Sequence, residues 1–488
     1  MTCMKSICCN TSTLIAVTLA LTIPGRVPAF GQIAASETID EAYSLVSDRI
    51  DNSTTGTLSV SVGSVHVPGA AWIRVHIGEY HLGPASYLTL IALDGQEQRF
   101  DAKSLADWYQ WSAIFNGDEV EINLHMAPGD TGVYVQIDRV VTSEPLDPAS
   151  GDSGQVASIC NDFDDRGGSN DPAVARMRIW NQVTGTLNTN GSCTAWLVSN
   201  GAVLSAGHCM RGGIPAGSVI EFNVPASLAN GANVAASAND QYPINVGSVM
   251  AEDNGRGEDW MVFAVNPNST TGVRAHIAQG FFFMTKAGPP IDTTLRVTGY
   301  GLDNIPAGPG GAGASCCDAD GDGTCEFNCN STSQTQQTTT GRLDDLDGSI
   351  IEHDVDTMPA NSGSPIIWEE FGLYTIGIHT AGGCDDFVDG YNNHGTRFNR
   401  GPLESALQNF LGPNTVYVDS YDSNLSANGG VFQPLRTVTA AVAAVPDNGI
   451  IGLVPGNYPR AAGNVFTAGA DGKAMTFIAP VGGAVIGN

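Results

Sequence analysis

The sequence has little positive charge. Its 21 lysine and arginine residues stand against 50 aspartate and glutamate residues, so the formal net charge is −29 over 488 residues. A surface of this sign repels the phosphates of nucleic acids and of anionic membranes, and the sequence therefore predicts neither as a partner. Such a charge is typical of a soluble secreted protein. Nothing in the sequence indicates an oligomeric state.

Long apolar runs are also missing after the N-terminus. No later segment approaches the roughly 18 apolar residues that a membrane helix needs, so we expect no membrane anchor. The N-terminus itself has Lys5, an apolar stretch over 14–23 and, at 29–31, a candidate cleavage site with small residues at positions 29 and 31. This pattern predicts a secretory signal peptide over 1–31 and hence a secreted protein, extracellular or periplasmic. A short buried helix is the alternative reading of the stretch.

Aromatic residues are scarce as well, at 7% of the chain, whereas glycine occurs 59 times. With an apolar share of 42%, this composition favours a folded, loop-rich, mostly β protein over a disordered one. A chain of 488 residues exceeds what one hydrophobic core usually serves, so we expect two or three domains.

Three of the 11 cysteines fall in the predicted signal peptide, which leaves an even number of eight. An even count fits a disulfide framework in an oxidising compartment, although spacing alone does not give the pairing. The eight are Cys160, Cys193, Cys209, Cys316, Cys317, Cys325, Cys329 and Cys384.

Residues 38–141 alternate short apolar runs with turn residues, which predicts a β-sandwich domain. The region resembles the β-sandwiches that precede some secreted bacterial peptidase domains. Whether it is a removable propeptide or a permanent module stays open. Residues 142–174 turn to proline, glycine, serine and aspartate, and we interpret them as a linker. The expected strands of the sandwich cover 57–62, 71–77, 87–93, 120–124 and 133–137.

Three motifs indicate nucleophilic catalysis. Ser362 lies among small residues in Asn-Ser-Gly-Ser-Pro, where tight backbone exposes a hydroxyl and turns amide N–H groups toward a developing oxyanion. His208 ends an apolar run in Ser-Ala-Gly-His-Cys, and Asp259 opens another in Asp-Trp-Met-Val-Phe. A lone Ser-Gly-Ser is usually a turn. A serine, a histidine base and an aspartate that orients it, each in a fitting context, favour catalysis instead.

At these motifs, over residues 170 to 412, the sequence resembles the chymotrypsin-fold serine peptidases, and specifically the glutamyl endopeptidase branch of secreted bacterial enzymes. The resemblance implies a double β-barrel peptidase domain over 175–412 that cleaves protein or peptide substrates without a catalytic cofactor. It implies His208 as general base, Asp259 as its orienting partner and Ser362 as nucleophile.

The resemblance also implies a disulfide from Cys193 to Cys209 and an oxyanion hole made of the N–H groups of Ala360 and Ser362. The branch usually has two glycines where this chain has Pro359 and Ala360. Alanine keeps its N–H but tolerates fewer backbone conformations than glycine, so a flipped peptide here would impair the hole.

For substrate binding, the resemblance implies Thr357, His379 and Thr380, and with them a preference for glutamate, then aspartate, before the scissile bond. A threonine hydroxyl and an imidazole N–H can replace the water of an incoming carboxylate. The alternative is that Thr357 and His379 are pocket-wall residues with structural hydrogen bonds. Asp356 also keeps open a rival preference for arginine.

A segment from about 303 to 340 contains alternating carboxylates with a glycine at the sixth position, the spacing of a calcium loop. Cys329 stands where an EF-hand has its twelfth-position glutamate, so a solvated acidic turn held by disulfides is an equal alternative. The proposed ligands of this structural calcium are Asp318, Asp320, Asp322 and Glu326.

Near the C-terminus, the apolar spacing over 401–410 predicts a closing helix of the peptidase domain. Residues 413–488 then resemble the opening coils of right-handed parallel β-helix proteins, because the apolar run at 450–453 recurs 25 residues later. So few coils indicate a capping or docking module.

The sequence thus predicts a mostly β secreted serine endopeptidase with a β-sandwich, a chymotrypsin-like double β-barrel and a short β-helix-like module. Two other functions stay open. One is a catalytically impaired peptidase fold that serves as a binding scaffold, and the other is polysaccharide binding through the C-terminal module. The latter lacks the clustered carboxylates or basic residues that lyase chemistry needs.

Overall fold

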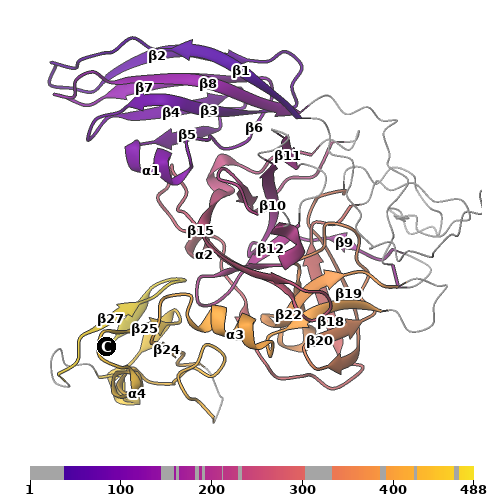
Figure 1. Ribbon diagram of the computed structural model, residues 1–488. Coiled ribbons are helices and arrows are strands. Elements are labelled where there is room, and N and C mark those ends of the chain that lie inside the picture. The colour runs from indigo at the N-terminus through magenta and orange to yellow at the C-terminus, as the bar shows by residue number, and fades with distance from the viewer. Residues whose placement is uncertain are drawn as a thin grey trace, which may run out of the picture. The chain divides into compact units, whose positions relative to one another are not determined.

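The computed structural model is mostly β, as the sequence predicts (Figure 1). No described helix is long and apolar enough to cross a membrane. The predicted signal peptide and the four predicted calcium ligands lie outside the described residues. The structure describes residues 38–143, 159–160, 164–181, 186–188, 193–210, 213–228, 233–302, 332–384, 392–421, 426–465 and 472–487.

Two four-stranded sheets form the N-terminal β-sandwich, with strand orders β1-β8-β3-β6 and β2-β7-β4-β5. In β7, every second residue from Val120 to Met126 is buried, because successive side chains of a strand point to opposite faces. Helix α1 (Ala102–Asp107) is capped by Asp101, whose side chain accepts the N–H of Ser104. The strands are β1 (Thr38–Val46), β2 (Leu58–His66), β3 (Trp72–His81), β4 (Tyr87–Ala92), β5 (Glu97–Phe100), β6 (Phe115–Asn116), β7 (Glu119–Met126) and β8 (Tyr134–Ser143).

Six antiparallel strands close into a first barrel, in the order β10-β12-β13-β16-β15-β14, with β14 pairing back to β10. Strand β16 is buried at six of its seven positions, which matches its apolar sequence. The strands are β10 (Val174–Asn181), β12 (Thr194–Leu197), β13 (Val203–Ser205), β14 (Val219–Glu221), β15 (Gln241–Asp253) and β16 (Asp259–Val265), and β11 (Thr186–Asn188) extends β10. The short helices here are η1 (Gly207–Met210), η2 (Ala238–Asp240) and α2 (Ala275–Ala278).

A second barrel has the order β21-β18-β19-β20-β23-β22, and β22 pairs back to β21. The two six-stranded barrels confirm the predicted double-barrel fold. The strands are β18 (Thr294–Gly299), β19 (Gln337–Asp347), β20 (Ile350–His353), β21 (Pro365–Trp368), β22 (Tyr374–Ala381) and β23 (Asn393–Arg397), with β17 (Phe283–Met284) beside β22 and η4 (Glu369–Phe371) between β21 and β22.

The segment before the first barrel is tied to the second. Strand β9 (Gly167–Gly168) pairs with β19, and a disulfide joins Cys160 to Cys384, 224 residues apart in the sequence. The Arg166 guanidinium donates to Asp164, Gln337 and the Leu302 carbonyl. Part of the region that the sequence marks as linker therefore contacts the peptidase barrels.

Helix α3 (Gly401–Gln408) follows the second barrel, where the sequence predicts the closing helix. The C-terminal residues then form two small parallel sheets, β24-β25-β27 and β26-β28, around their own apolar cluster. The elements are β24 (Thr415–Val418), α4 (Val438–Ala444), β25 (Gly449–Leu453), β26 (Gly456–Tyr458), η5 (Arg460–Ala462), β27 (Met475–Ile478) and β28 (Ala484–Ile486).

Candidate active site

His208 and Asp259 are joined by two hydrogen bonds. Nδ1 of the His208 ring lies 2.6 Å from Oδ2 of Asp259, and the His208 backbone N–H donates to Oδ1 at 2.9 Å. His208 lies in η1 directly after β13, and Asp259 is the first residue of β16. The pairing of β13 with β16 in the first barrel brings the two residues together.

Two local features fix this pair. A Cβ added to Gly207 would lie 1.8 Å from the Glu252 carbonyl oxygen, so only glycine lets η1 pack this closely on β15. The Thr396 hydroxyl on β23 donates to the Asp259 carbonyl at 2.8 Å and accepts the Asp259 N–H at 3.3 Å. Asp259 is thus anchored to both barrels.

The loop that presents Ser362 begins with a tight turn. The Asn361 N–H donates to the Met358 carbonyl at 3.0 Å, and Ala360 has a φ of +78°. A positive φ at the third residue defines a type II turn, whose second position favours proline, here Pro359. The chain therefore adopts the turn that proline favours, although this turn places Ala360 in the left-handed backbone conformation.

The peptides on both sides of Ala360 are each held in one orientation. The Pro359 carbonyl accepts the Leu302 N–H at 3.1 Å, and the Ala360 carbonyl accepts the Thr194 hydroxyl at 3.0 Å. Because the N–H of a trans peptide points opposite to its carbonyl, the Ala360 N–H faces away from Leu302. Among the described residues, neither this N–H nor that of Ser362 has an acceptor. Both donors are available to an oxyanion.

The Ser362 loop packs against the chain that leads to His208. The Ser362 carbonyl accepts the Thr194 N–H at 2.9 Å. A Cβ on Gly363 would meet the Thr194 carbonyl oxygen at 2.1 Å and the Ser205 hydroxyl at 2.3 Å. Within the described ranges, neither Nε2 of His208 nor Oγ of Ser362 has a hydrogen-bond partner. Catalytic hydrogen bonds are often long without substrate.

Three histidines lie on adjacent strands of the second barrel. The order β20-β23-β22 places His353, His394 and His379 next to one another, and all three are largely buried. Burial lowers the pKa of His353 to about 3 and that of His394 to about 4. Burial, and then the neighbouring His353, also lower the pKa of His379. We therefore expect neutral imidazoles at neutral pH.

Hydrogen bonds assign the protons of two of these rings. Nδ1 of His353 accepts the Val355 N–H at 3.2 Å, so the proton of the neutral His353 ring is on Nε2. That Nε2 lies 3.3 Å from Nδ1 of His379 and donates to it. The proton of His379 is then on its own Nε2, which has no partner among the described residues. His379 thus presents an N–H donor.

The other predicted substrate-binding residues are buried. The Thr357 hydroxyl is buried and lacks a hydrogen-bond partner, whereas the Thr380 hydroxyl donates to the His394 carbonyl at 3.3 Å. The His379 backbone pairs with the Ser362 loop, because its carbonyl accepts the Gly363 N–H at 2.7 Å. This bond places His379 beside the loop that carries Ser362.

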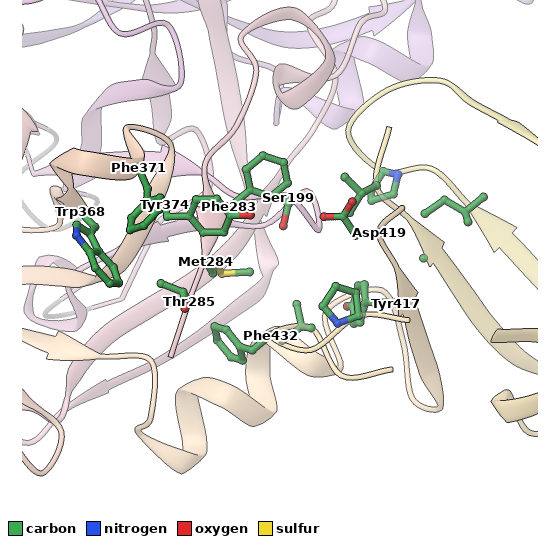
Figure 2. Close-up of a pocket in the computed structure, with 16 residues that line it drawn as sticks. Ser199, Phe283, Met284, Thr285, Trp368, Phe371, Tyr374, Tyr417, Asp419 and Phe432 are labelled. Atoms are coloured by element: carbon green, nitrogen blue, oxygen red, sulfur yellow. The ribbon is translucent and has the colours of Figure 1, made fainter. Parts of the chain in front are cut away.

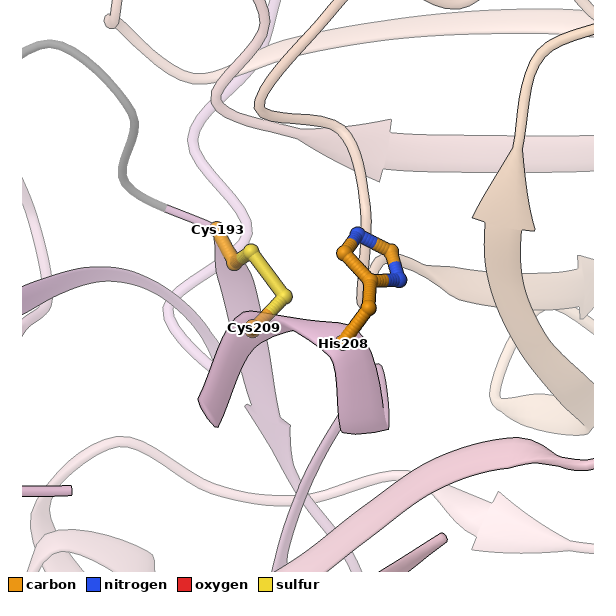
Figure 3. A group of neighbouring side chains, drawn as sticks. All are labelled: Cys193, His208 and Cys209. Atoms are coloured by element: carbon orange, nitrogen blue, oxygen red, sulfur yellow. A yellow bond between two sulfur atoms is a disulfide. The ribbon is translucent and has the colours of Figure 1, made fainter. Parts of the chain in front are cut away.

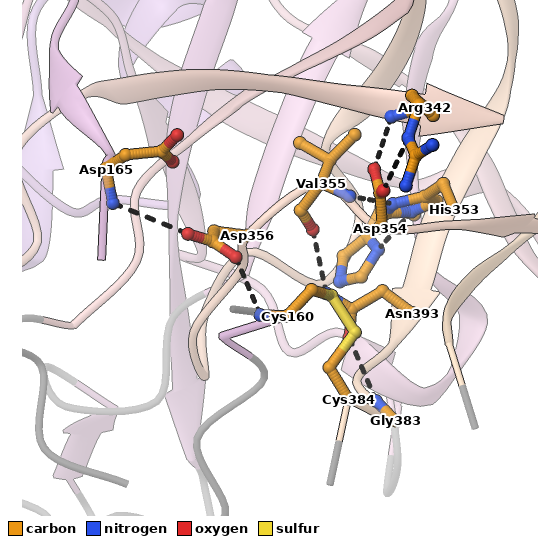
Figure 4. The surroundings of a disulfide bond; sticks show 11 residues. Cys160, Asp165, Arg342, His353, Asp354, Val355, Asp356, Gly383, Cys384 and Asn393 are labelled. Atoms are coloured by element: carbon orange, nitrogen blue, oxygen red, sulfur yellow. Dashed lines mark hydrogen bonds and ion pairs between the residues drawn. A yellow bond between two sulfur atoms is a disulfide. The ribbon is translucent and has the colours of Figure 1, made fainter. Parts of the chain in front are cut away.

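Asp356 is engaged by the segment before the barrels (Figure 4). Its two carboxylate oxygens accept the backbone N–H groups of Cys160, at 2.7 Å, and Asp165, at 3.4 Å. Burial, and then the nearby Asp165 carboxyl, raise its pKa to about 7. The Cys160–Cys384 disulfide holds this segment in place, and the Asn393 amide donates to the Val355 carbonyl beside it. The Asp356 carboxylate is therefore occupied inside the chain.

Cys193, His208 and Cys209 lie close together in the way that metal ligands do (Figure 3). The two cysteines form a disulfide, the pair that the resemblance implies, at a sequence separation of 16. Thiolates that are consumed in a disulfide cannot ligate a metal, and His208 bonds Asp259. The cluster is therefore no metal site.

A cavity of about 340 Å³ lies elsewhere, where the second barrel meets the C-terminal module (Figure 2). Its wall includes Trp368, Phe371 and Tyr374 from the peptidase domain, and Tyr417 and Phe432 from the C-terminal residues. None of the predicted catalytic or substrate-binding residues lines it. The chemistry of the Ser362 loop and this cavity are thus separate.

Sequence reasoning missed His353 and Thr194. A lone histidine at the end of a strand shows no pattern, and only the strand order β20-β23-β22 and the 3.3 Å contact between the two rings reveal that it supports His379. Thr194 follows Cys193 directly, but nothing in the sequence indicates that its hydroxyl and N–H hold the loop of Ser362. The motif around Ser362 could have suggested a search for such a partner.

The strand order defines the fold class: a double six-stranded β-barrel of the chymotrypsin type. Residues 170–398 match the family model for trypsin, and this part of the chain is a trypsin-like domain. No curated protein sequence matches the chain.

Two solved structures are similar at low identity. A Glu endopeptidase is 15% identical with a TM-score of 0.33, and the match covers 53% of this chain and 96% of that one. An inactivated protease paralogue of the scabies mite is 13% identical with a TM-score of 0.32, and the match covers 48% and 94%. The fold assignment rests on the strand order and the family match.

Proposed function

We propose that the protein is a secreted serine endopeptidase in which Ser362 is the nucleophile, His208 the general base and Asp259 its orienting partner. One observation carries the proposal: in a trypsin-like domain, the Asp259 carboxylate accepts both N–H groups of the residue that the sequence identifies as the base. The disulfides fit secretion, because such bonds persist in oxidising compartments.

The hydrogen bond to Asp259 determines which nitrogen of His208 reacts. With Nδ1–H donating to the carboxylate, Nε2 carries a lone pair and can take the proton of Ser362. The imidazolium that forms is stabilised by Asp259 and returns the proton to the leaving amine. The Ser362 oxygen meanwhile bonds the carbonyl carbon, and the oxyanion accepts the N–H groups of Ala360 and Ser362.

We further propose a preference for glutamate before the scissile bond. The support is a set of neutral donors: Nε2–H of His379, set by His353, and the partnerless hydroxyl of Thr357. A carboxylate that loses water needs such hydrogen bonds. Asp356 does not fit a site for arginine, because its oxygens already accept two backbone N–H groups.

A cleavage-site profile on a peptide library tests this function, with Ser362→Ala and His379→Ala beside the wild type. We expect cuts after glutamate that vanish in Ser362→Ala. Because His379→Ala removes a hydrogen-bond donor to a charged group, we expect it to lower kcat/KM for glutamate sites by about ten- to a hundredfold. Cuts dominated by arginine, lysine or aromatic residues would contradict the preference, as would an unchanged profile in His379→Ala.

A structural calcium in the acidic segment stays a separate proposal, with Asp318, Asp320, Asp322 and Glu326 as ligands. A cation that binds only the folded state stabilises it by mass action. We expect calcium to raise the melting temperature of the wild type but not of a variant that combines Asp320→Ala and Asp322→Ala. An equal response of both would mean that the segment is only acidic.

A further inference from the structure

We propose that the N-terminal β-sandwich, residues 38–143, is a permanent subunit of the peptidase and not a removable propeptide. It binds a face of the first barrel, and it stays bound without any covalent link if the segment between the two is cut. We name this face the docking face, and it consists of residues 217–246 and 266–270.

The sandwich and the docking face share one hydrophobic core. Val219, Ala235 and Ala238 belong to the first barrel, yet all three are buried in the apolar cluster of the sandwich. Trp111 of the sandwich lies so close to Gly217 that a Cβ there would be 2.7 Å from the indole. Removing the sandwich would expose these apolar side chains to water, which costs free energy in proportion to their area.

Two side-chain amides form hydrogen bonds with backbone groups across the contact, in the way that a neighbouring strand would. The Gln241 amide accepts the Ile114 N–H at 2.9 Å and donates to the Ile114 carbonyl at 2.8 Å. The Asn116 amide does the same for Ala235, at 2.8 and 3.0 Å. Gln241 is fully buried, so separation would leave paired backbone groups without partners or force them to find water.

A second set of hydrogen bonds extends the contact to both ends of the docking face. Its geometry is specific, because most of these bonds join a side chain on one part to a backbone group on the other. The pairs are Ala238 N–H to Gln96 at 3.0 Å, Val246 N–H to Tyr109 at 3.1 Å, Asn266 to the Asp107 carbonyl at 2.7 Å, Trp108 to the Pro267 carbonyl at 3.4 Å, Gln98 to Ser269 at 3.0 Å and Arg99 N–H to Thr270 at 3.0 Å.

The docking face does not include the proposed catalytic residues. Strands β15 and β16 are antiparallel, with Asp253 opposite Asp259 at one end and Ile244 opposite Val265 at the other. The sandwich contacts β15 at Gln241 and Val246, whereas Asp259 lies about 20 Å away along the strand at ~3.4 Å per residue. A sandwich in this position does not cover Asp259 or His208, which is hydrogen-bonded to Asp259. It supports the barrel that carries them.

No disulfide fastens the sandwich. Residues 38–143 contain no cysteine, and both described disulfides involve residues from Cys160 onward. A single cut within 144–158 therefore leaves two chains that are held together without a covalent bond, by the docking face and by a smaller contact between β1 and β11. This makes the contact measurable.

The test inserts the recognition sequence of a site-specific protease within 144–158 of the full chain, in a Ser362→Ala background that prevents self-cleavage. After cutting, we expect the two fragments to coelute in size exclusion at micromolar concentration and to separate only in denaturant. Elution as separate, folded fragments would overturn the proposal. Because this readout needs no activity, it is independent of the proposed function.

Two interface variants and a control sharpen the result. Asn116→Ala removes the two hydrogen bonds to Ala235. We therefore expect it to raise the dissociation constant of the fragments by about tenfold. Gln96→Ala removes one interfacial hydrogen bond, together with a bond to Asp94 inside the sandwich, and serves if Asn116→Ala does not fold. Glu121→Gln, on the exposed surface of β7, is the control and should change nothing. Equal constants for all three variants would also overturn the proposal.

An activity measurement separates a subunit from an inhibitor. The cut wild-type protein should cleave peptides at the rate of the uncut protein, because the docking face excludes the catalytic residues. An increase of about tenfold or more on cutting, with release of the sandwich, would show a propeptide and contradict the proposal.

Discussion

Ala360 stands where the resemblance that the motifs suggest would place a glycine. Its φ of +78° is a conformation that costs an alanine roughly 1 kcal/mol, which glycine avoids. Pro359 offsets part of that cost, because its ring presets the second position of the type II turn. The substituted turn therefore keeps the N–H of Ala360 turned away from Leu302.

Ala360→Gly tests this account. Relief of the left-handed strain and the greater freedom of glycine in the unfolded chain act in opposite directions, so we expect a stability change between zero and a gain of about 1 kcal/mol, with turnover retained. Ala264→Gly, in β16 and without a positive φ, is the matched control and should lose stability by roughly 0.5–1 kcal/mol. A clear loss in Ala360→Gly, measured by denaturant unfolding, would contradict the described turn.

His353 acts through His379 and is a positioning residue. Its loss leaves the tautomer of His379 unfixed, so His353→Leu should raise KM for glutamate peptides by roughly three- to tenfold with little change in kcat. The same variant should leave sites without glutamate unaffected. His66→Leu, on the sandwich surface, is the control. An equal fall of kcat for every peptide would instead indicate a general loss of structure.

For single residues, the sequence predicted the candidate catalytic residues but not the contacts that hold them in place. The contexts of His208, Asp259 and Ser362 are local, so a motif can show them. The partners of those residues lie far away in the chain: Thr194 is 166 residues from Ala360, and Thr396 is 137 residues from Asp259. Such contacts depend on strand pairing between the barrels, which local patterns do not contain.

Among the elements, the segment that precedes the first barrel is the one that composition describes least well. Glycine and aspartate there indicate a linker, yet β9 pairs with β19 and backbone N–H groups of the segment bind Asp356. The apolar runs of the sandwich were easier, because alternation predicts where β2, β3, β4, β7 and β8 begin. Strands β2, β3 and β8 nevertheless continue beyond the predicted ends. Strand β9 consists of two glycines, so it has no apolar side chains whose alternation could reveal it.

The pKa of Asp356 predicts how this segment responds to pH. Its value of about 7 in the folded chain lies above the roughly 3.9 of an unfolded aspartate. The folded state therefore binds more protons between these values, so this contribution is fully present below pH 4 and is lost as pH rises through 7. Relative to Asp356→Asn, the wild-type melting temperature should fall between pH 4 and pH 8. A constant difference across that range would contradict the assignment.

The strand β14 contributes a buried carboxylate to two arginines. Oε2 of Glu221 accepts hydrogen bonds from the Nε–H groups of Arg176 and Arg178, at 3.0 and 2.7 Å, and all three side chains are buried. The arginines lower the pKa of Glu221 despite its burial. This cluster joins β10 to β14, which closes the first barrel.

Glu221→Gln should therefore destabilise the fold by about 3–5 kcal/mol, because it removes the buried negative charge that both guanidinium groups contact. The lowered pKa of Glu221 means that its contribution is present above the unfolded value and is lost as pH falls. Glu352→Gln breaks a partly exposed pair with Arg256 and should cost at most about 1 kcal/mol. Equal losses in urea unfolding would show that burial of the cluster is not decisive.

For the whole molecule, composition and periodicity predicted the fold class but not the assembly of its parts. The net charge, the signal-like N-terminus and the even cysteine count point to a secreted protein, and apolar alternation points to β domains. The packing of the sandwich on the first barrel depends on pairs such as Gln241 with Ile114, 127 residues apart. No local pattern predicts that a glutamine will replace a strand partner.

The central claim is that Ser362, His208 and Asp259 act as one catalytic unit. The direct measurement is the turnover of one peptide substrate by the wild type, Ser362→Ala, His208→Ala and the double variant. We predict that each single variant loses several orders of magnitude and that the double variant is little worse, because members of a triad do not act additively. Retained turnover in Ser362→Ala, or losses that simply multiply in the double variant, would contradict the account.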